Sequence, residues 1–114
     1  MTISKTPGTI PQEEIRAVAH QIARKFNPDK IILFGSYAHE NYHPYSDVDL
    51  LVILEKNQNG DDPEIEVGLS VPHKFPMDIL VRSPQQIAER LQMGDTFICD
   101  IIKRGVVLYE RLGQ

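Results

Sequence analysis

Short apolar runs, separated by polar or helix-like sequence, limit the fold of this chain more than any other feature. Residues 30–34 and 48–54 form runs of the kind that is typical of buried strands. Residues 77–81 predict a third strand, and the proline just before it stands where a missing backbone donor is tolerated. Residues 106–109 predict a small final strand. We therefore expect four strands.

The segments around these runs predict helices. Residues 11–26 carry apolar side chains at helical spacing, and Thr9 with Gln12 offers a capping box at the start. Residues 64–71 alternate like a strand but follow an Asp-Pro pair that is typical of a helix start, and we favour a short helix.

Two more helices are predicted before the last strand. Ser83 with Gln86 forms a second capping box, and Gly94 ends that helix. Residues 95–104 predict a helix that buries Phe97, Ile98, Ile101 and Ile102. Because helices and strands alternate in this way, we expect an α/β (α+β) fold with one mixed sheet and helices packed on it.

The length and composition fit one compact domain. The chain has 114 residues, of which 41% are hydrophobic and 25% charged, so we expect a single domain over residues 1–114. Residues 1–8 lack periodicity and are expected to form a flexible N-terminus, and residues 56–63 a surface loop. No stretch approaches the roughly 18 apolar residues of a membrane span, so no membrane association is expected.

Charge and cysteine content exclude several classes of protein. The net charge of -4 argues against stable nucleic-acid binding through phosphate neutralisation, although a nucleotide carried by a divalent cation is compatible with it. Cys99 is the only cysteine, which rules out an internal disulfide and a multi-cysteine metal site. A cytoplasmic location is the default expectation, and a homo-oligomer stays open.

A candidate phosphate and metal site lies between the first two runs. Gly35 allows close approach of the backbone to a ligand, and Ser36 adds a hydroxyl beside amide groups that can receive phosphate oxygens. Asp47 and Asp49 lie two apart on an extended chain, so their carboxylates project from one face, about 6.5 to 7 Å apart along the backbone. Such a pair can share a divalent cation, or it can be solvated in a loop.

A third acid favours the cation site. Asp78 interrupts the apolar run at residues 77–81. An unpaired carboxylate inside a buried strand is costly unless a cation or hydrogen bonds satisfy it. If this strand neighbours the one at residues 48–54, three carboxylates converge.

These residues resemble the signature of the DNA polymerase beta-like nucleotidyltransferase superfamily, and specifically of its minimal nucleotidyltransferase (MNT) domains. In that signature a strand ends at Gly-Ser, and Asp-x-Asp follows after about ten residues. Gly35 and Ser36, the segment 46–50 and Asp78 match its phosphate-binding dipeptide, metal-binding pair and third carboxylate. Residues 101–109 are also similar to the end of minimal members.

The resemblance implies a role for each of these residues. Asp47 and Asp49 would hold Mg²⁺ on the triphosphate of ATP, while Asp78 would complete a second Mg²⁺ site and help to activate the acceptor hydroxyl. The residues implied in nucleotide binding are Gly35, Ser36 and Ser46. Two such ions, about 3.5 to 4 Å apart, suit nucleotidyl transfer with pyrophosphate as the leaving group.

The resemblance also implies a partner. Stand-alone MNT domains typically pair with a helical HEPN protein as a toxin–antitoxin system, in which the MNT protein is the antitoxin. Some members transfer AMP from ATP to a tyrosine of the HEPN ribonuclease toxin. We therefore expect a HEPN toxin as the protein acceptor.

Other interpretations stay open beside this one. Glu40 stands where the family commonly has glycine, so the chain could instead be a weak or inactive module that neutralises its HEPN partner by binding alone. A small hydroxylated acceptor is a further alternative. Residues 39–43 match H-E-x-x-H, but that zinc motif works only on a helix, and the following Pro44 makes a chance match the better explanation.

Several remaining side chains are interpreted as structural. Cys99 is expected to be a small buried hydrophobe, and Lys74 and Arg82 to be solvated charges at strand ends rather than phosphate ligands. The three tyrosines within residues 37–45 could stack on a base or simply pack in the loop. The nucleotide base, the acceptor atom and the number of AMP units are not determined by the sequence.

Overall fold

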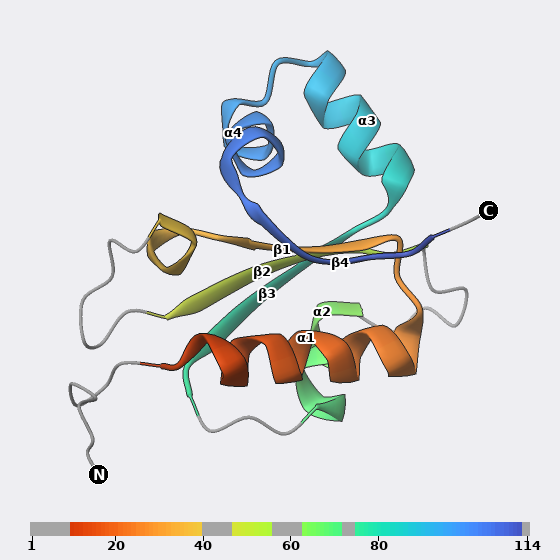
Figure 1. Cartoon of the computed structure of the whole chain (residues 1–114). Helices are drawn as coiled ribbons and strands as arrows, with labels where there is room; N and C mark the ends of the chain where they lie inside the picture. Colours follow the sequence, from red (N-terminus) through yellow and green to blue (C-terminus); the bar gives the residue numbers. More distant parts are fainter. Residues whose placement is uncertain (1–9, 40–46, 56–62, 72–74, 113–114) are drawn as a thin grey trace, which may run out of the picture.

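A computed structural model of the chain describes residues 10–39, 47–55, 63–71 and 75–112. Helices and strands alternate along it, as Figure 1 shows. In chain order the elements are α1 (Gln12–Phe26), β1 (Lys30–Phe34), the 3₁₀ helix η1 (Ser36–His39), β2 (Val48–Ile53), α2 (Pro63–Ser70), β3 (Met77–Arg82), α3 (Pro84–Gln92), α4 (Thr96–Arg104) and β4 (Val106–Glu110).

The four strands of the described residues form one mixed sheet in the order β3-β2-β1-β4. Strand β1 is antiparallel to both β2 and β4, whereas β2 and β3 are parallel. The parallel pair is joined through α2, because two parallel strands require a crossover connection. The predicted α/β class with a mixed sheet is confirmed, and so is the helix in place of a strand at α2.

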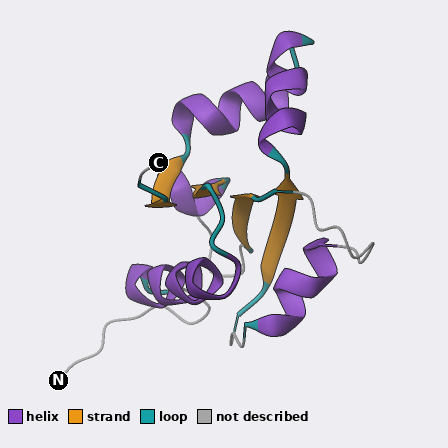
Figure 2. Cartoon of the chain, turned by 90° about the vertical axis from the view of Figure 1, so that its right-hand side faces the viewer, coloured by secondary structure: helices purple, strands orange, loops and turns teal. Residues whose placement is uncertain are grey.

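Helices cover both faces of this sheet. Figures 1 and 2 show α1 and α2 on one side and α3 and α4 on the other. Alternate residues of β1 therefore enter two separate cores. Ile31 and Leu33 pack in the core of α1 and α2, and Ile32 packs in the core of α3 and α4.

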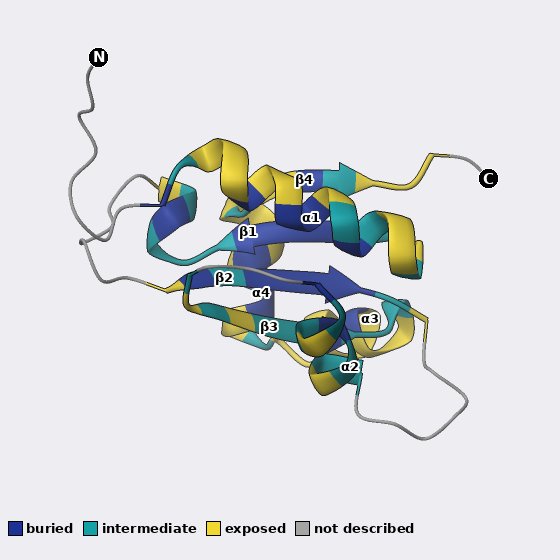
Figure 3. Cartoon of the chain, turned by 90° about the horizontal axis from the view of Figure 1, so that it is seen from below, coloured by how far each residue is buried: buried dark blue, intermediate teal, exposed yellow. Residues whose placement is uncertain are grey.

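Central and edge strands differ in burial, as the view in Figure 3 shows. Strands β1 and β2 are buried over most of their length. Strand β3, at the edge, is mostly half-buried. Asp78 lies on it and is exposed, so the expectation of a carboxylate inside a fully buried strand is wrong. Among the described residues, no strand pairs with the outer side of β3.

The two predicted capping boxes have different outcomes. In α3 the box is present: the Gln86 amide donates to Ser83 Oγ at 3.0 Å, and the Ser83 amide donates to Gln86 Oε1 at 2.8 Å. In α1 the predicted box is wrong, because Pro11 is the N-cap and no side chain caps the helix. The helix begins at Gln12, which is thus the first helical residue and not the third. Thr9 lies outside the described residues.

The last helix buries a narrower stripe than expected. Asp95 caps α4 by accepting a hydrogen bond from the Ile98 amide at 3.1 Å, and Ile98 and Ile101 are buried. Phe97 and Ile102, also predicted to be buried, are 53% and 38% exposed. A helix that packs on a sheet buries one stripe, and these two side chains lie on its flanks.

None of the helices in the described ranges combines the length and the apolar character that crossing a bilayer requires. The loop predicted at residues 56–63 falls, except for Pro63, outside the described residues. Pro63 itself begins α2.

Candidate functional site

Two of the three predicted acids lie side by side on neighbouring strands. Asp49 pairs in register with Phe34 of β1 on one side and with Asp78 of β3 on the other. By strand alternation these three side chains share the face of Leu51 and Leu80, which packs toward α3 and α4. We call this set, Phe34, Asp49 and Asp78, the cross-strand row.

The cross-strand row lies at one end of the sheet, where β1 ends and β2 and β3 begin. Asp47 immediately precedes β2 and is exposed. Because Asp47 and Asp49 are two residues apart, they extend from the same side of the chain. Asp47, Asp49 and Asp78 thus lie at the same end of the sheet, near enough for the charges of Asp47 and Asp78 to act on Asp49. Ser46 lies outside the described residues.

The electrostatics of Asp49 reflect this crowding. Its pKa is raised from 3.8 to about 6, first by burial and then by the negative charges of Asp78 and Asp47. A side-chain hydrogen bond with Asp78 contributes as well. Two carboxyl groups can share such a bond only if one of them holds a proton, so ionisation of both at once is disfavoured.

Gly35 contacts this group of acids directly. Its φ angle of +78° is in the region that favours glycine. A Cβ atom at this position would lie 2.3 Å from Oδ2 of Asp49, which is impossible without movement. The glycine therefore leaves room for the Asp49 carboxylate. The motif spacing pointed to a role in phosphate binding, but it contained no signal for this contact, which depends on how β1 and β2 pair.

Beyond Gly35 the chain turns into η1. The Ala38 amide donates to the Gly35 carbonyl at 3.1 Å, and Ser36 is half-buried at the start of the turn. Tyr37 is buried in the core, and its hydroxyl accepts a hydrogen bond from the Ile10 amide at 3.2 Å. Of the two interpretations of this tyrosine, packing is therefore the correct one. Residues 40–46, with the other two tyrosines, lie outside the described residues.

Arg82 has a structural partner at the far end of β3. Its guanidinium Nη1 lies 2.6 Å from Oε2 of Glu64, which also accepts a hydrogen bond from the Val81 amide at 3.1 Å. Arg82 lies at the end of the strand, as predicted, but its guanidinium is paired with Glu64 and not simply solvated. Arg82 is four residues from Asp78 on an extended strand, which separates it from the cross-strand row. Lys74 lies outside the described residues.

The acids at this end of the sheet are the right donors for a divalent cation of the Mg²⁺ type. Hard cations prefer carboxylate oxygens, and mutual repulsion of the three charges is relieved when a cation lies among them. Asp49 and Asp78 share a hydrogen bond here, so a cation would take the place of a proton. Within the described ranges, no three histidine, cysteine or acidic side chains already form a metal-binding cluster.

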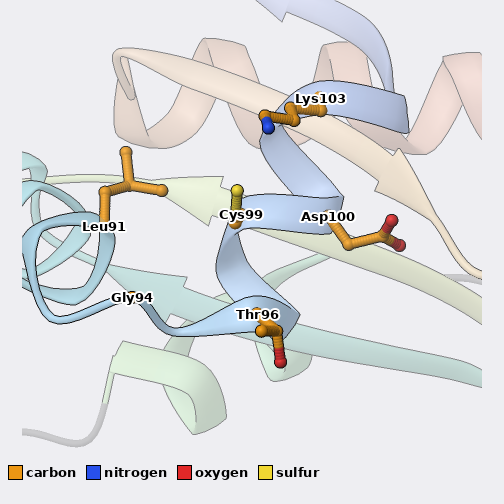
Figure 4. Close-up of a pocket in the computed structure, with 6 residues that line it drawn as sticks. All are labelled: Leu91, Gly94, Thr96, Cys99, Asp100 and Lys103. Carbon is orange, nitrogen blue, oxygen red and sulfur yellow. The ribbon is translucent and has the colours of Figure 1, made fainter.

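Two cavities lie away from these acids. One, of about 260 Å³, opens between α3 and α4 (Figure 4), and it is lined by Leu91, Gly94, Thr96, Cys99, Asp100 and Lys103. Cys99 is half-buried at this surface rather than buried in the core as expected, because it faces away from the stripe of Ile98 and Ile101. The other cavity, also about 260 Å³, lies beside α1 and β4.

Comparison with known proteins gives matches over most of the chain. The family described as "Polymerase beta, Nucleotidyltransferase" matches residues 16–113. A protein of Methanocaldococcus jannaschii, which carries the provisional name of a protein adenylyltransferase, is 31% identical over 78 residues. That match covers 68% of this chain and 76% of the relative.

Solved structures share the fold. A protein of Sulfolobus solfataricus, provisionally named a nucleotidyltransferase, superimposes with a TM-score of 0.59 at 16% identity, over 87% of this chain and 79% of its own. A toxin–antitoxin structure with AMP-PNP gives a TM-score of 0.51 at 20% identity, over 84% of this chain and 73% of the other. At such low identity the likeness concerns the fold alone.

Proposed function

This chain belongs to the polymerase beta nucleotidyltransferase family and is a nucleotidyltransferase, and from that premise we propose a specific reaction. In it, the protein uses Mg²⁺ to transfer AMP from ATP to a tyrosine hydroxyl of a HEPN ribonuclease toxin, and so acts as the antitoxin. The observation that carries the proposal is the meeting of Asp47, Asp49 and Asp78 at one end of the sheet, beside Gly35.

Each residue has a proposed task. Asp47 and Asp49 would hold the cation that the triphosphate chelates, and Asp78 would complete a second cation site and help to remove the proton of the acceptor hydroxyl. Phosphate oxygens are held by Gly35, Ser36 and Ser46. The bound cations would neutralise charge on the attacking and leaving oxygens.

The proposed transfer is an in-line displacement. The acceptor oxygen forms a bond to the α-phosphorus of ATP, the bond from that phosphorus to the bridging oxygen of the β-phosphate breaks, and pyrophosphate leaves. Asp78 suits the acceptor side because it lies exposed on the edge strand, where a large acceptor can approach. Asp49 is half-buried on the neighbouring strand and suits the nucleotide side.

Two comparisons support a protein acceptor. The relative from Methanocaldococcus jannaschii has a name that specifies protein adenylylation. The toxin–antitoxin structure with AMP-PNP has the same fold. Both are consistent with the resemblance to MNT domains that pair with HEPN toxins.

The test is a mass measurement of the partner. The protein is incubated with a HEPN protein encoded beside it, ATP and Mg²⁺, and the HEPN protein is then weighed by mass spectrometry. We expect a gain of one or more AMP units, which is lost when Asp47→Ala or Asp49→Ala replaces the wild type. The surface variant Asp100→Asn, which removes an exposed acid on α4, is expected to keep the gain.

Other outcomes would redirect the proposal. Neutralisation of the toxin without any gain in mass would support the binding-only module suggested by Glu40. Labelling of a small hydroxylated molecule, with the HEPN protein unlabelled, would replace the acceptor but keep the chemistry.

A further inference from the structure

A half-exposed aromatic ring lies next to the cross-strand row. Phe97, in the first turn of α4, meets Phe34 edge to face, with ring centroids 5.8 Å apart and planes at 83°. Although this contact is made, 53% of Phe97 is exposed. The packing of α4 on the sheet is supplied by Ile98 and Ile101. The exposed part of the Phe97 ring is therefore available for a further contact.

Register places the ring that Phe97 contacts beside the acids. Phe34 is the in-register neighbour of Asp49 and lies on the same face of the sheet. Paired residues on adjacent antiparallel strands have Cα atoms about 4.5 to 5.5 Å apart. Phe97 contacts Phe34, and Phe34 is paired with Asp49, so a single residue links the Phe97 ring to Asp49. Figure 1 shows α4 above this side of the sheet.

We propose that Phe97 is the stacking platform for the base of the nucleotide. This inference rests on the proposed function, because it takes the triphosphate to be held at Asp47 and Asp49. The base of a nucleotide is tied to its α-phosphate through the ribose, so it must lie a short distance to one side of the acids. An aromatic ring gives a sequence-tolerant contact, since every base has a π-face.

The order of Phe34, Asp49 and Asp78 across the sheet determines on which side of the acids the base lies. Phe34 lies on the β1 side of Asp49, and Asp78 lies on the β3 side, at the open edge of the sheet. The acceptor approaches over the exposed edge, so the base is directed toward β1, where Phe97 lies. A ring already held by Phe34 and by the first turn of α4 loses little conformational freedom on stacking.

The test separates the base from the phosphates. Binding of a non-hydrolysable ATP analogue and of inorganic tripolyphosphate, each with Mg²⁺, is measured by calorimetry. We expect Phe97→Leu to weaken binding of the ATP analogue about tenfold, since base–aromatic stacks contribute on that order. Tripolyphosphate, which has no base, is expected to bind the wild type and the variant equally. Phe97→Tyr keeps a ring and is expected to restore binding.

A fluorescence measurement detects contact with the base directly, so its result does not depend on small losses in the stability of the variants. The chain has no tryptophan, so Phe97→Trp introduces a single reporter. We expect the ATP analogue, but not tripolyphosphate, to quench its emission. Ile102→Ala, on the other flank of α4 and 38% exposed, is the matched control and is expected to bind the analogue like the wild type.

The outcomes distinguish the two proposals. If the wild type binds both probes but Phe97→Leu binds the ATP analogue with unchanged affinity, or the Trp variant shows no quenching, the platform is wrong and the proposed function stands. If the wild type binds neither probe in Mg²⁺, the proposed function itself fails. A rise in the KM for the acceptor protein, with unchanged ATP affinity, would assign Phe97 to the acceptor and overturn the inference.

Discussion

At the scale of single residues, Gly35 is constrained both by its backbone conformation and by the side chain of Asp49. Two constraints meet there: a φ of +78° and a gap of 2.3 Å between its virtual Cβ and Oδ2 of Asp49. Gly94 has nearly the same φ, +81°, but nothing lies within 4 Å of its virtual Cβ. The pair therefore separates backbone strain from displacement of a carboxylate.

We predict that Gly35→Ala and Gly94→Ala both lower the free energy of unfolding by about 1 to 2 kcal/mol, the cost of a left-handed conformation for a residue with a side chain. Only Gly35→Ala also moves Asp49, and a misplacement of about 1 Å can reduce catalysis about 100-fold. Transfer activity and urea unfolding check both effects. Equal activity of the two variants would show that the close approach to Asp49 has no functional weight.

At the scale of elements, the helix ends show which local signals are reliable. The capping box of α3 was predicted correctly because Ser83 precedes the helix and Gln86 lies in its first turn, so all the interacting atoms are local. The N-cap of α1 was predicted wrongly, because Pro11 is the N-cap, two residues after Thr9, and the helix begins at Gln12.

We predict that Ser83→Ala lowers the free energy of unfolding by about 1 kcal/mol, since the Gln86 amide loses its acceptor. Urea denaturation of Ser83→Ala, Gln86→Ala and the double variant forms a double-mutant cycle, which gives the coupling free energy between the two side chains. The double variant should lose less than the sum of the single variants, because the two hydrogen bonds belong to one motif. Simple additivity would mean that the two bonds act independently.

At the scale of the whole molecule, the acids connect the candidate site to global stability. The pKa of Asp49 is raised to about 6 in the folded protein from 3.8, so the folded state binds a proton more tightly than the unfolded state. Without metal, this group therefore makes stability fall as pH rises from about 4 to about 6, and its cost is fully present above that range.

We predict that Asp49→Asn, which cannot ionise, gains stability relative to the wild type over this window. The difference in free energy of unfolding should be smaller at pH 4 than at pH 7, measured in urea without divalent cations. Added Mg²⁺ should then stabilise the wild type more than the variant at pH 7. A difference that does not change between pH 4 and pH 7 would contradict the raised pKa.

Much of the fold could be predicted because its signals are local. The strands at Lys30–Phe34 and Val48–Ile53 and the helices around them follow from runs and periodicities that a few neighbouring residues define. Burial on helix flanks was harder to predict. Phe97 has the apolar character of a core residue, yet its position on the flank of α4 leaves half of it exposed. A single domain and a cytoplasmic location stay predictions.

The sequence by itself determined the candidate site residues, because Asp47 precedes an apolar run, Asp49 and Asp78 are the second residues of two such runs, and Gly35 with Ser36 follows a strand. Their meeting was decided only by tertiary structure, since Asp49 and Asp78 are joined by strand register across 29 positions of chain. The same is true of Gly35 against Asp49 and of Phe97 on Phe34. Strand pairing is a non-local choice, made by the burial of two opposite faces at once, and no short segment encodes it.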